Sequence, residues 1–158
     1  MNVQLLDSSL LRSDPDAFEM HLQSARESLE ALSVFYPEFG AWFTERVMPG
    51  VVAGERTLVL QNISGLLSGV AVLKDSPDEQ KLCCLRVLPA FQGTGAGVRL
   101  FEKSLELLNN KAPLLSVSEE QLQVFEKIFK YFGFERSESY FEIYKPKKTE
   151  ISFNGILI

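Results

Sequence analysis

Apolar residues recur at helical spacing in the first third of the chain and predict two helices there. A short apolar run at residues 2–6 predicts a strand before them. From Pro15 to Leu32 the apolar positions lie three or four residues apart, and Asp14 stands where an N-cap is expected. The same spacing then restarts and stops before Pro49, because proline ends a regular helix. We expect the two helices to pack side by side.

Runs of β-branched and apolar residues predict three strands in the middle of the chain. Residues 56–62 and 66–74, separated by a short turn that contains Gly65, predict an antiparallel hairpin. Residues 81–88 form a third run that is almost continuously apolar. Such a run is typical of a strand that is covered on both faces.

The second half of the chain alternates between the two patterns. The expected elements are a glycine-rich loop with a helix that ends at Asn109, a strand at residues 112–118, a helix at 119–132, and strands at 134–145 and 149–158. This order predicts a mixed α/β (α+β) fold, with a mostly antiparallel central sheet of about seven strands and about four flanking helices. The length of 158 residues fits a single domain, residues 1–158.

Composition argues against several classes of protein. The hydrophobic share of 46% is too high for a disordered chain. A formal net charge of −5 argues against nucleic acid as a partner, and the acids concentrate in the first half of the chain, which favours a cationic ligand there. The two cysteines, Cys83 and Cys84, are adjacent and fit neither a disulfide framework nor a metal site. The chain shows no leader and no long apolar segment, so we expect a cytoplasmic protein with no membrane partner and no metal.

The sequence LRVLPAFQGTGAG places three glycines between a predicted strand and a predicted helix. Free backbone N–H groups at such a junction bind phosphate, and glycine lets the anion approach closely. No GKS or GKT follows, which excludes a P-loop, and the spacing of the glycines does not fit a dinucleotide-binding fold. From the glycines alone, a simple turn stays the alternative.

The residues around these glycines resemble the GCN5-related N-acetyltransferase (GNAT) family. Gln92 to Gly97 match its Q/R-x-x-G-x-G/A signature. Similar features are the hydrophobic-x-Val-x-Pro run that ends at Pro89, the aromatic Phe91, and the YFGF sequence that ends the later helix. The resemblance covers residues 56–144 and implies an acetyl-CoA-binding core there.

The resemblance implies an N-acetyltransferase that moves an acetyl group from acetyl-CoA to a primary amine, of a small molecule or a peptide, by direct attack on the thioester. The loop N–H groups would hold the pyrophosphate of this co-substrate, and the preceding strand would pair with its pantetheine arm. The binding residues that the resemblance implies are Val87, Leu88, Gln92, Gly93, Thr94, Gly95, Ala96, Gly97 and Val98.

Three positions depart from the family pattern. Phe129, Leu122 and Lys81 stand where many members have a tyrosine, an asparagine and a glutamate. We take Glu119 and Tyr131 as catalytic candidates in their place. The departures also leave open a second function, a non-catalytic acyl-CoA-binding or regulatory module with the same fold. Further candidates for proton transfer are Glu120, Ser116 and Ser118.

Two expectations concern surfaces rather than chemistry. The aromatic residues of the second helix lie where the family lines its acceptor cleft, although we expect them mainly to pack in the core. Tyr144 is expected to be a half-buried strand residue. The apolar C-terminal run ISFNGILI would form an exposed edge if it were unpaired, which suggests a homodimer. The aromatic residues in question are Tyr36, Phe39, Trp42 and Phe43.

Overall fold

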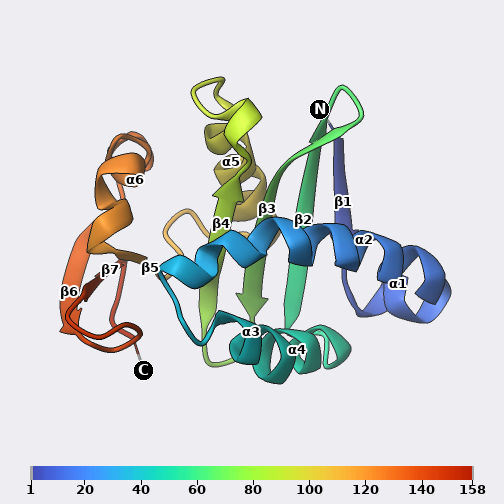
Figure 1. Ribbon diagram of the computed structural model, residues 1–158, viewed down its shortest axis with the longest axis horizontal. Coiled ribbons are helices and arrows are strands. Elements are labelled where there is room, and N and C mark those ends of the chain that lie inside the picture. The colour runs from blue at the N-terminus through green and yellow to red at the C-terminus, as the bar shows by residue number, and fades with distance from the viewer. Residues whose placement is uncertain (1, 158) are drawn as a thin grey trace.

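The computed structural model describes residues 2–157 and has the expected mixed α/β architecture (Figure 1). Among these residues seven strands form two antiparallel sheets, in the orders β1-β2-β3-β4 and β5-β7-β6. The strand count agrees with the prediction, but the central sheet is split into a four-stranded and a three-stranded part. The strands are β1 (Asn2–Leu6), β2 (Arg56–Ile63), β3 (Leu66–Asp75), β4 (Gln80–Val87), β5 (Leu115–Ser118), β6 (Arg136–Phe141) and β7 (Thr149–Phe153).

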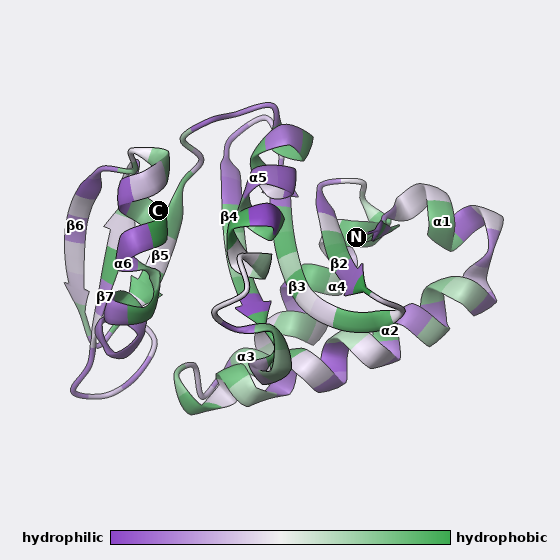
Figure 2. Cartoon of the chain, turned by 90° about the horizontal axis from the view of Figure 1, so that it is seen from above, coloured by the Kyte–Doolittle hydropathy of each residue, from purple (hydrophilic) through white to green (hydrophobic). Residues whose placement is uncertain are grey.

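Helices cover both faces of the four-stranded sheet. Figure 2 shows α2 and α3 on one side of strands β2 to β4 and α5 on the other. The helix α6 lies on the three-stranded sheet, beyond β4 (Figure 1). The α-helices are α1 (Ser8–Ser13), α2 (Pro15–Leu29), α3 (Phe39–Trp42), α4 (Met48–Val52), α5 (Ala96–Leu108) and α6 (Glu119–Phe132). The shorter turns are the 3₁₀ segments η1 (Glu30–Val34) and η3 (Pro89–Phe91) and the π-helical segment η2 (Phe43–Val47).

Alternation along β2 and β3 divides the core into two hydrophobic clusters. Leu58 and Val70 face α2 and α3 in the first, which we name the α2 cluster. Val59 and Ala71, one residue further along each strand, face α5 and α6 in the second, the α5 cluster. Successive side chains of a strand point to opposite faces, so helices on both sides explain the almost continuous apolar runs of these strands.

The predicted end of the second helix before Pro49 is wrong. The helical path runs on from α3 through η2 into α4 and ends at Val52. In η2 the N–H of Met48 bonds the carbonyl oxygen of Phe43, five residues back rather than four. A proline ring clashes with the carbonyl four residues before it, and the wider π turn provides room for Pro49 within the helical path.

The C-terminal strand is shorter than predicted and is not an edge. β7 ends at Phe153 and lies between β5 and β6, so it is paired on both sides. Because β7 is paired within the chain, the apolar C-terminal run gives no argument for a homodimer. Within residues 2–157, none of the helices combines the length and the apolar character needed to cross a bilayer.

The two sheets meet at one parallel bridge, between Lys81 and Leu114. The N–H of Leu82 donates to the carbonyl of Leu114 at 2.9 Å. The register between β3 and β4 then shifts, because Val72 pairs with Cys84 and Leu73 with Leu82, which leaves Cys83 as an extra residue. Such a bulge bends its strand, and β4 separates from β5 beyond this point.

Close packing of α5 on the sheet depends on Gly69 in β3. A Cβ atom there would lie 2.8 Å from Leu100 Cδ2 and 3.0 Å from the backbone oxygen of Arg86. We expect Gly69→Ala to lower the free energy of unfolding by about 1–3 kcal/mol, as overpacking does. Gly40→Ala is the matched control, since a Cβ at Gly40 would meet nothing within 4 Å. Urea unfolding of both variants is the measurement; equal stability would show that α5 does not pack as described.

Candidate functional site

The loop before α5 forms a junction suited to an anion. Gly93 and Gly95 have φ angles of +76° and +83°, which other residues rarely adopt. No side chain caps the N-terminus of α5, whereas Asp7, Asp14 and Ser118 cap α1, α2 and α6. The first N–H groups of a helix have no partner within the helix, so those of α5 are available to a negatively charged ligand.

The sequence-predicted loop residues all lie at this junction. The side chain of Gln92 folds back, and its Nε2 donates to the carbonyl of Val87 at 3.1 Å. The hydroxyl of Thr94 donates to the carbonyl of Phe91 and closes the turn. The remaining predicted residues, Gly93 and Gly95 to Val98, form the loop and the first turn of α5.

The two predicted strand residues, Val87 and Leu88, differ in what they can bind. The N–H of Leu88 donates to the carbonyl of Ser68 at 2.9 Å, and its own carbonyl accepts from Phe91 at 2.9 Å. Both polar groups of Leu88 are thus engaged within the chain, which does not fit its predicted role in pairing with a ligand. Because the backbone groups of an antiparallel strand alternate in direction, those of Val87 and Leu85 point away from β3, toward the gap beside β5.

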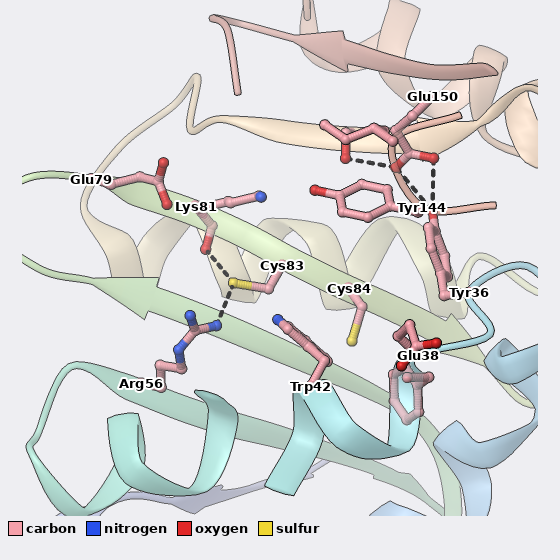
Figure 3. A pocket seen from close by; sticks show the side chains of 13 residues that line it. Tyr36, Glu38, Trp42, Arg56, Glu79, Lys81, Cys83, Cys84, Tyr144 and Glu150 are labelled. Carbon is pink, nitrogen blue, oxygen red and sulfur yellow. Dashed lines mark hydrogen bonds between the residues drawn. The ribbon is translucent and has the colours of Figure 1, made fainter. Parts of the chain in front are cut away.

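A cavity of about 320 Å³ lies where the two sheets separate (Figure 3). One wall is aromatic and comes from the segment around α3, with Tyr36, Phe39 and Trp42. A second wall comes from β4 and a third from β5, β7 and the loop between β6 and β7. The lining residues that carry polar or ionisable groups are Tyr36, Glu38, Arg56, Glu79, Lys81, Cys83, Cys84, Ser116, Tyr144 and Glu150.

The carboxyl group of Glu150 is the most buried acidic group of this cavity. Only 4% of the residue is exposed. The hydroxyl of Ser116 donates to its Oε2 at 2.7 Å, and the hydroxyl of Tyr36 lies 3.1 and 3.3 Å from its two oxygens. Burial raises the pKa of Glu150, and the two hydroxyls and the charge of Lys81 oppose that rise only in part. Glu150 is therefore a base stronger than an ordinary carboxylate.

The hydroxyl of Tyr36 is a proton-bearing group beside this base. Burial and the charge of Glu150 raise the pKa of Tyr36 far above its usual value, so the hydroxyl stays protonated at neutral pH. The ring of Tyr144 meets that of Tyr36 edge to face, with 5.7 Å between the centroids. Burial also raises the pKa of Tyr144, to about 12. Tyr144 lies after β6, in the loop to β7, rather than on a strand as predicted.

The two cysteines face the same cavity but are not activated. Burial raises the pKa of both Cys83 and Cys84 above the ordinary thiol value. Both are therefore thiols, not thiolates, at neutral pH, and a thiol is a poor nucleophile.

The sequence-predicted catalytic residues lie outside the cavity. Tyr131 is 68% exposed, and Glu119 is exposed at the start of α6. Glu120 pairs with Lys145 at 3.3 Å, and Ser118 caps α6. Of the five candidates, only Ser116 is brought to the cavity between the sheets.

The position expected to carry the family tyrosine does face inward. Phe129 is 4% exposed, and its ring centroid lies 4.5 Å from that of Phe153. It also lines a narrower cavity of about 60 Å³ between β4, β5 and α6, which Tyr36 reaches from the other side. The side chain of α6 that faces inward at this position is thus Phe129, which has no proton to donate.

Sequence reasoning missed Glu150 and underrated Tyr36. Phe39 and Phe43 are buried in the α2 cluster, so the expectation of core packing is confirmed for both, and Tyr36 and Trp42 pack against that cluster. Tyr36, Phe39 and Trp42 also line the cavity. The available signal for Glu150 was its place in TEISF, where an acid interrupts an otherwise apolar strand. A buried strand does not carry an unpaired acid without a reason.

Comparisons with known proteins agree on one family. Residues 23–144 match the family model described as an acetyltransferase (GNAT) domain. The fold is similar to that of a GNAT-family protein from Desulfovibrio desulfuricans, with 17% identity, a TM-score of 0.66, and coverage of 96% of this chain and 97% of that one. No protein with a curated function matches the sequence.

Two further solved structures share the fold over nearly the whole chain. Escherichia coli ElaA has 18% identity and a TM-score of 0.64, covering 96% of this chain and 99% of its own. An aminoglycoside 6′-N-acetyltransferase complexed with coenzyme A has 14% identity and a TM-score of 0.59, covering 97% of this chain and 95% of its own.

The buried carboxyl group makes stability depend on pH. Because the folded-state pKa of Glu150 exceeds the unfolded value of about 4.3, its ionisation costs more in the folded protein. Its contribution to the free energy of unfolding therefore falls as the pH rises from that unfolded value through the folded pKa, and stays low above it. We expect Glu150→Gln to melt at a higher temperature than the parent at pH 7 to 8, with the difference narrowing toward pH 4.

Thermal unfolding across this pH range, followed by circular dichroism, is the measurement. Glu102→Gln is the matched control, because Glu102 is exposed on α5 and should show no such pH-dependent difference. A Glu150→Gln variant that is less stable than the parent at every pH would contradict the described burial.

Proposed function

The chain belongs to the GNAT family of acetyltransferases, and from this we propose that it transfers an acetyl group from acetyl-CoA to a primary amine by direct attack on the thioester. One observation carries the proposal: the buried Glu150, held by two hydroxyl donors, shares a cavity with the strand that leads to the uncapped end of α5. We take residues 1–158 as one transferase domain, with the acetyl-CoA-binding core at residues 56–144.

The loop and the open edge of β4 fit acetyl-CoA. Backbone N–H groups from Gln92 to Val98 would bind the pyrophosphate, since two left-handed glycines and an uncapped helix leave them available. The N–H of Val87 and the backbone groups of Leu85 would pair with the pantetheine arm, as an added strand pairs with a sheet edge, while the carbonyl of Val87 accepts from Gln92. From Val87 to Cys84 is three residues, or about 10 Å at the usual rise of a strand, which leads from the loop to the cavity.

Glu150 would act as the general base. An amine is protonated in neutral water and must lose a proton before or during its attack on the acetyl carbon. A carboxylate whose pKa burial has raised takes up a proton more readily than an exposed one. The site would also hold the amine against the thioester and so supply orientation.

Tyr36 would return a proton to the sulfur that leaves. Its hydroxyl is protonated, bonds to Glu150, and belongs to a residue that lines both the large cavity and the narrow one beside Phe129. As the carbon–sulfur bond breaks, Tyr36 would give its proton to the sulfur and take back the proton that Glu150 removed from the amine. The products are then an amide and a free thiol, with no covalent enzyme intermediate.

Two apolar residues, at positions where many GNAT members have polar ones, favour a second function without catalysis. Phe129 and Leu122 offer no group for proton transfer, as expected for an acyl-CoA-binding or regulatory module. The two functions differ in turnover: a module binds acetyl-CoA but releases no thiol when a panel of amines is added.

Replacing the proposed acid and base tests the mechanism. We expect Glu150→Gln to lower kcat/KM for the amine by about 10²- to 10⁴-fold, which is the usual contribution of a general base. In the parent, activity should fall on the acid side with an apparent pKa above that of an ordinary glutamate, and the variant should lack this limb. Tyr36→Phe should lower kcat and leave the KM for acetyl-CoA nearly unchanged.

Thiol release at saturating acetyl-CoA, measured from pH 5 to 9, is the assay. Tyr131→Phe serves as the matched control for Tyr36→Phe, because its ring is exposed and outside the cavity. Full activity of Glu150→Gln across the pH range would remove Glu150 from the mechanism.

A substitution at Gly95 tests the proposal that the loop before α5 binds the pyrophosphate. Ala is costly at a φ of +83°, by about 1–2 kcal/mol, so Gly95→Ala should shift the loop and raise the KM for acetyl-CoA by about tenfold. Gly65→Ala carries a similar strain, at a φ of +79°, in the turn between β2 and β3. It should lower stability to a similar extent without changing this KM. Equal KM values for the two variants would contradict a pyrophosphate site at Gly95.

A further inference from the structure

The cavity that holds Glu150 has charges of opposite sign at its two ends. Glu150 lies at one end, and Arg56, at the start of β2, lies at the other (Figure 3). Lys81 stands between them: its charge opposes the rise in pKa of both Glu150 and Cys83, whereas the charge of Arg56 opposes the rise in pKa of Cys83 and Cys84. A ligand that fills the cavity therefore meets an acid and an arginine at separate points.

The side chain of Arg56 is held in place from three sides. A Cβ atom at Gly50 would lie 2.6 Å from its Cδ, so the absence of a side chain there makes room for the stem of Arg56. The guanidinium carbon lies 5.7 Å from the centre of the Trp42 ring, in a cation–π contact. Its Nη1 donates to the sulfur of Cys83 at 3.3 Å. The guanidinium is thus fixed in the wall rather than free in solvent.

This fixed cation has no acidic partner within the described chain. Among residues 2–157, no ion pair involves Arg56 or Lys81. Two acids besides Glu150 line the cavity: Glu79 pairs with Lys74 at 3.3 Å, and Glu38 is exposed. A guanidinium presents five N–H donors in a planar fork that matches a carboxylate, and a thiol satisfies at most one of them.

Part of the wall between the charged ends is apolar. Phe39, Trp42 and Ile143 line it, and they suit a chain of methylene groups rather than a row of hydroxyls. The volume of about 320 Å³ is at the small end of ligand pockets, which run from about 300 to 1,000 Å³. A short, flexible molecule fits this space.

We infer that the acceptor is a small ω-amino carboxylate: a primary amine that approaches Glu150, joined by a short apolar chain to a carboxylate that pairs with Arg56. This inference rests on the proposed function and names its substrate class. It differs from the cationic ligand that the acidic first half of the sequence favours, because a second ammonium group would meet Arg56, and Glu79, which also lines the cavity, already pairs with Lys74. The charges that line the cavity, and not the net charge of the chain, decide which end groups are tolerated.

Three probes with five carbon atoms each test the inference: 5-aminopentanoate, pentylamine and 1,5-diaminopentane. We expect kcat/KM to be at least about tenfold higher for 5-aminopentanoate than for pentylamine, and lowest for the diamine. Arg56→Gln should remove most of the advantage of 5-aminopentanoate, and activity on pentylamine should stay within about twofold of the parent. Retained activity on pentylamine and an unchanged KM for acetyl-CoA also show that the variant is folded.

Two further variants sharpen the test. Arg56→Glu should reverse the order and favour the diamine over 5-aminopentanoate. Arg46→Gln is the matched control, since Arg46 is exposed on η2, outside the cavity, and should keep the parent order. Equal kcat/KM values for 5-aminopentanoate and pentylamine, or an equal loss on both in Arg56→Gln, would overturn the inference.

Binding separates this inference from the proposed function. Calorimetry with 5-aminopentanoate, in the presence of coenzyme A, measures the carboxylate site without turnover. Binding that is lost in Arg56→Gln, together with no acetylation of any probe, would support the carboxylate site and contradict the transferase. Acetylation of all three probes at similar rates would support the transferase and contradict the carboxylate site.

Discussion

The two sheets are joined by one parallel bridge, and the site depends on how that contact ends. Leu82 bonds to Leu114, and the next residue, Cys83, is the extra residue of a bulge. A bulge bends its strand, so β4 leaves β5 directly after the bridge. The backbone groups of Leu85 and Val87 then face a gap instead of a strand. An extended ligand can satisfy them, and the cavity beyond the gap exists because no strand fills it.

Stability and chemistry conflict at Glu150. The central strand of a small sheet is a poor place for a carboxylate, because burial disfavours its charged form. The hydroxyls of Ser116 and Tyr36 offset only part of this cost, and the pKa of Glu150 stays raised. Burial lowers the free energy of unfolding at pH values above the pKa of Glu150, and the same burial makes its carboxylate a stronger base. Pairs of groups whose environments tune them in this way are typical of acid–base sites.

The elements that the sequence predicted correctly are those that depend on interactions between residues close together in the chain. Apolar periodicity, N-capping and the conformational freedom of glycine predict the strands, α2, α5 and the glycine junction. Each of these effects acts between residues that are close together in the sequence. The helix through Pro49 was missed because a π turn, invisible in the apolar spacing, makes room for the ring. Helical register separates Phe129, which faces inward, from Tyr131, which does not. Two residues are about 200° around a helix, so only one of these two side chains can face the site.

Long-range contacts decided what the sequence could not predict. Leu88 matches the family pattern, but the register of β3 against β4 already uses its N–H. Tyr36, Ser116 and Glu150 form one group although 114 residues separate the first from the last. No spacing rule connects residues this far apart. Only the order β5-β7-β6 and the turn before α3 bring them together.

The two cavities rest in part on different hydrophobic clusters. Trp42, in the wall of the large cavity, packs against the α2 cluster, whereas Phe129, in the wall of the narrow cavity, belongs to the α5 cluster together with residues from the first turns of α5. A substitution that reshapes the wall around α3 therefore disturbs one cluster and spares the other. Over evolution, the wall around α3 can therefore change residue by residue while the glycine loop before α5 stays intact.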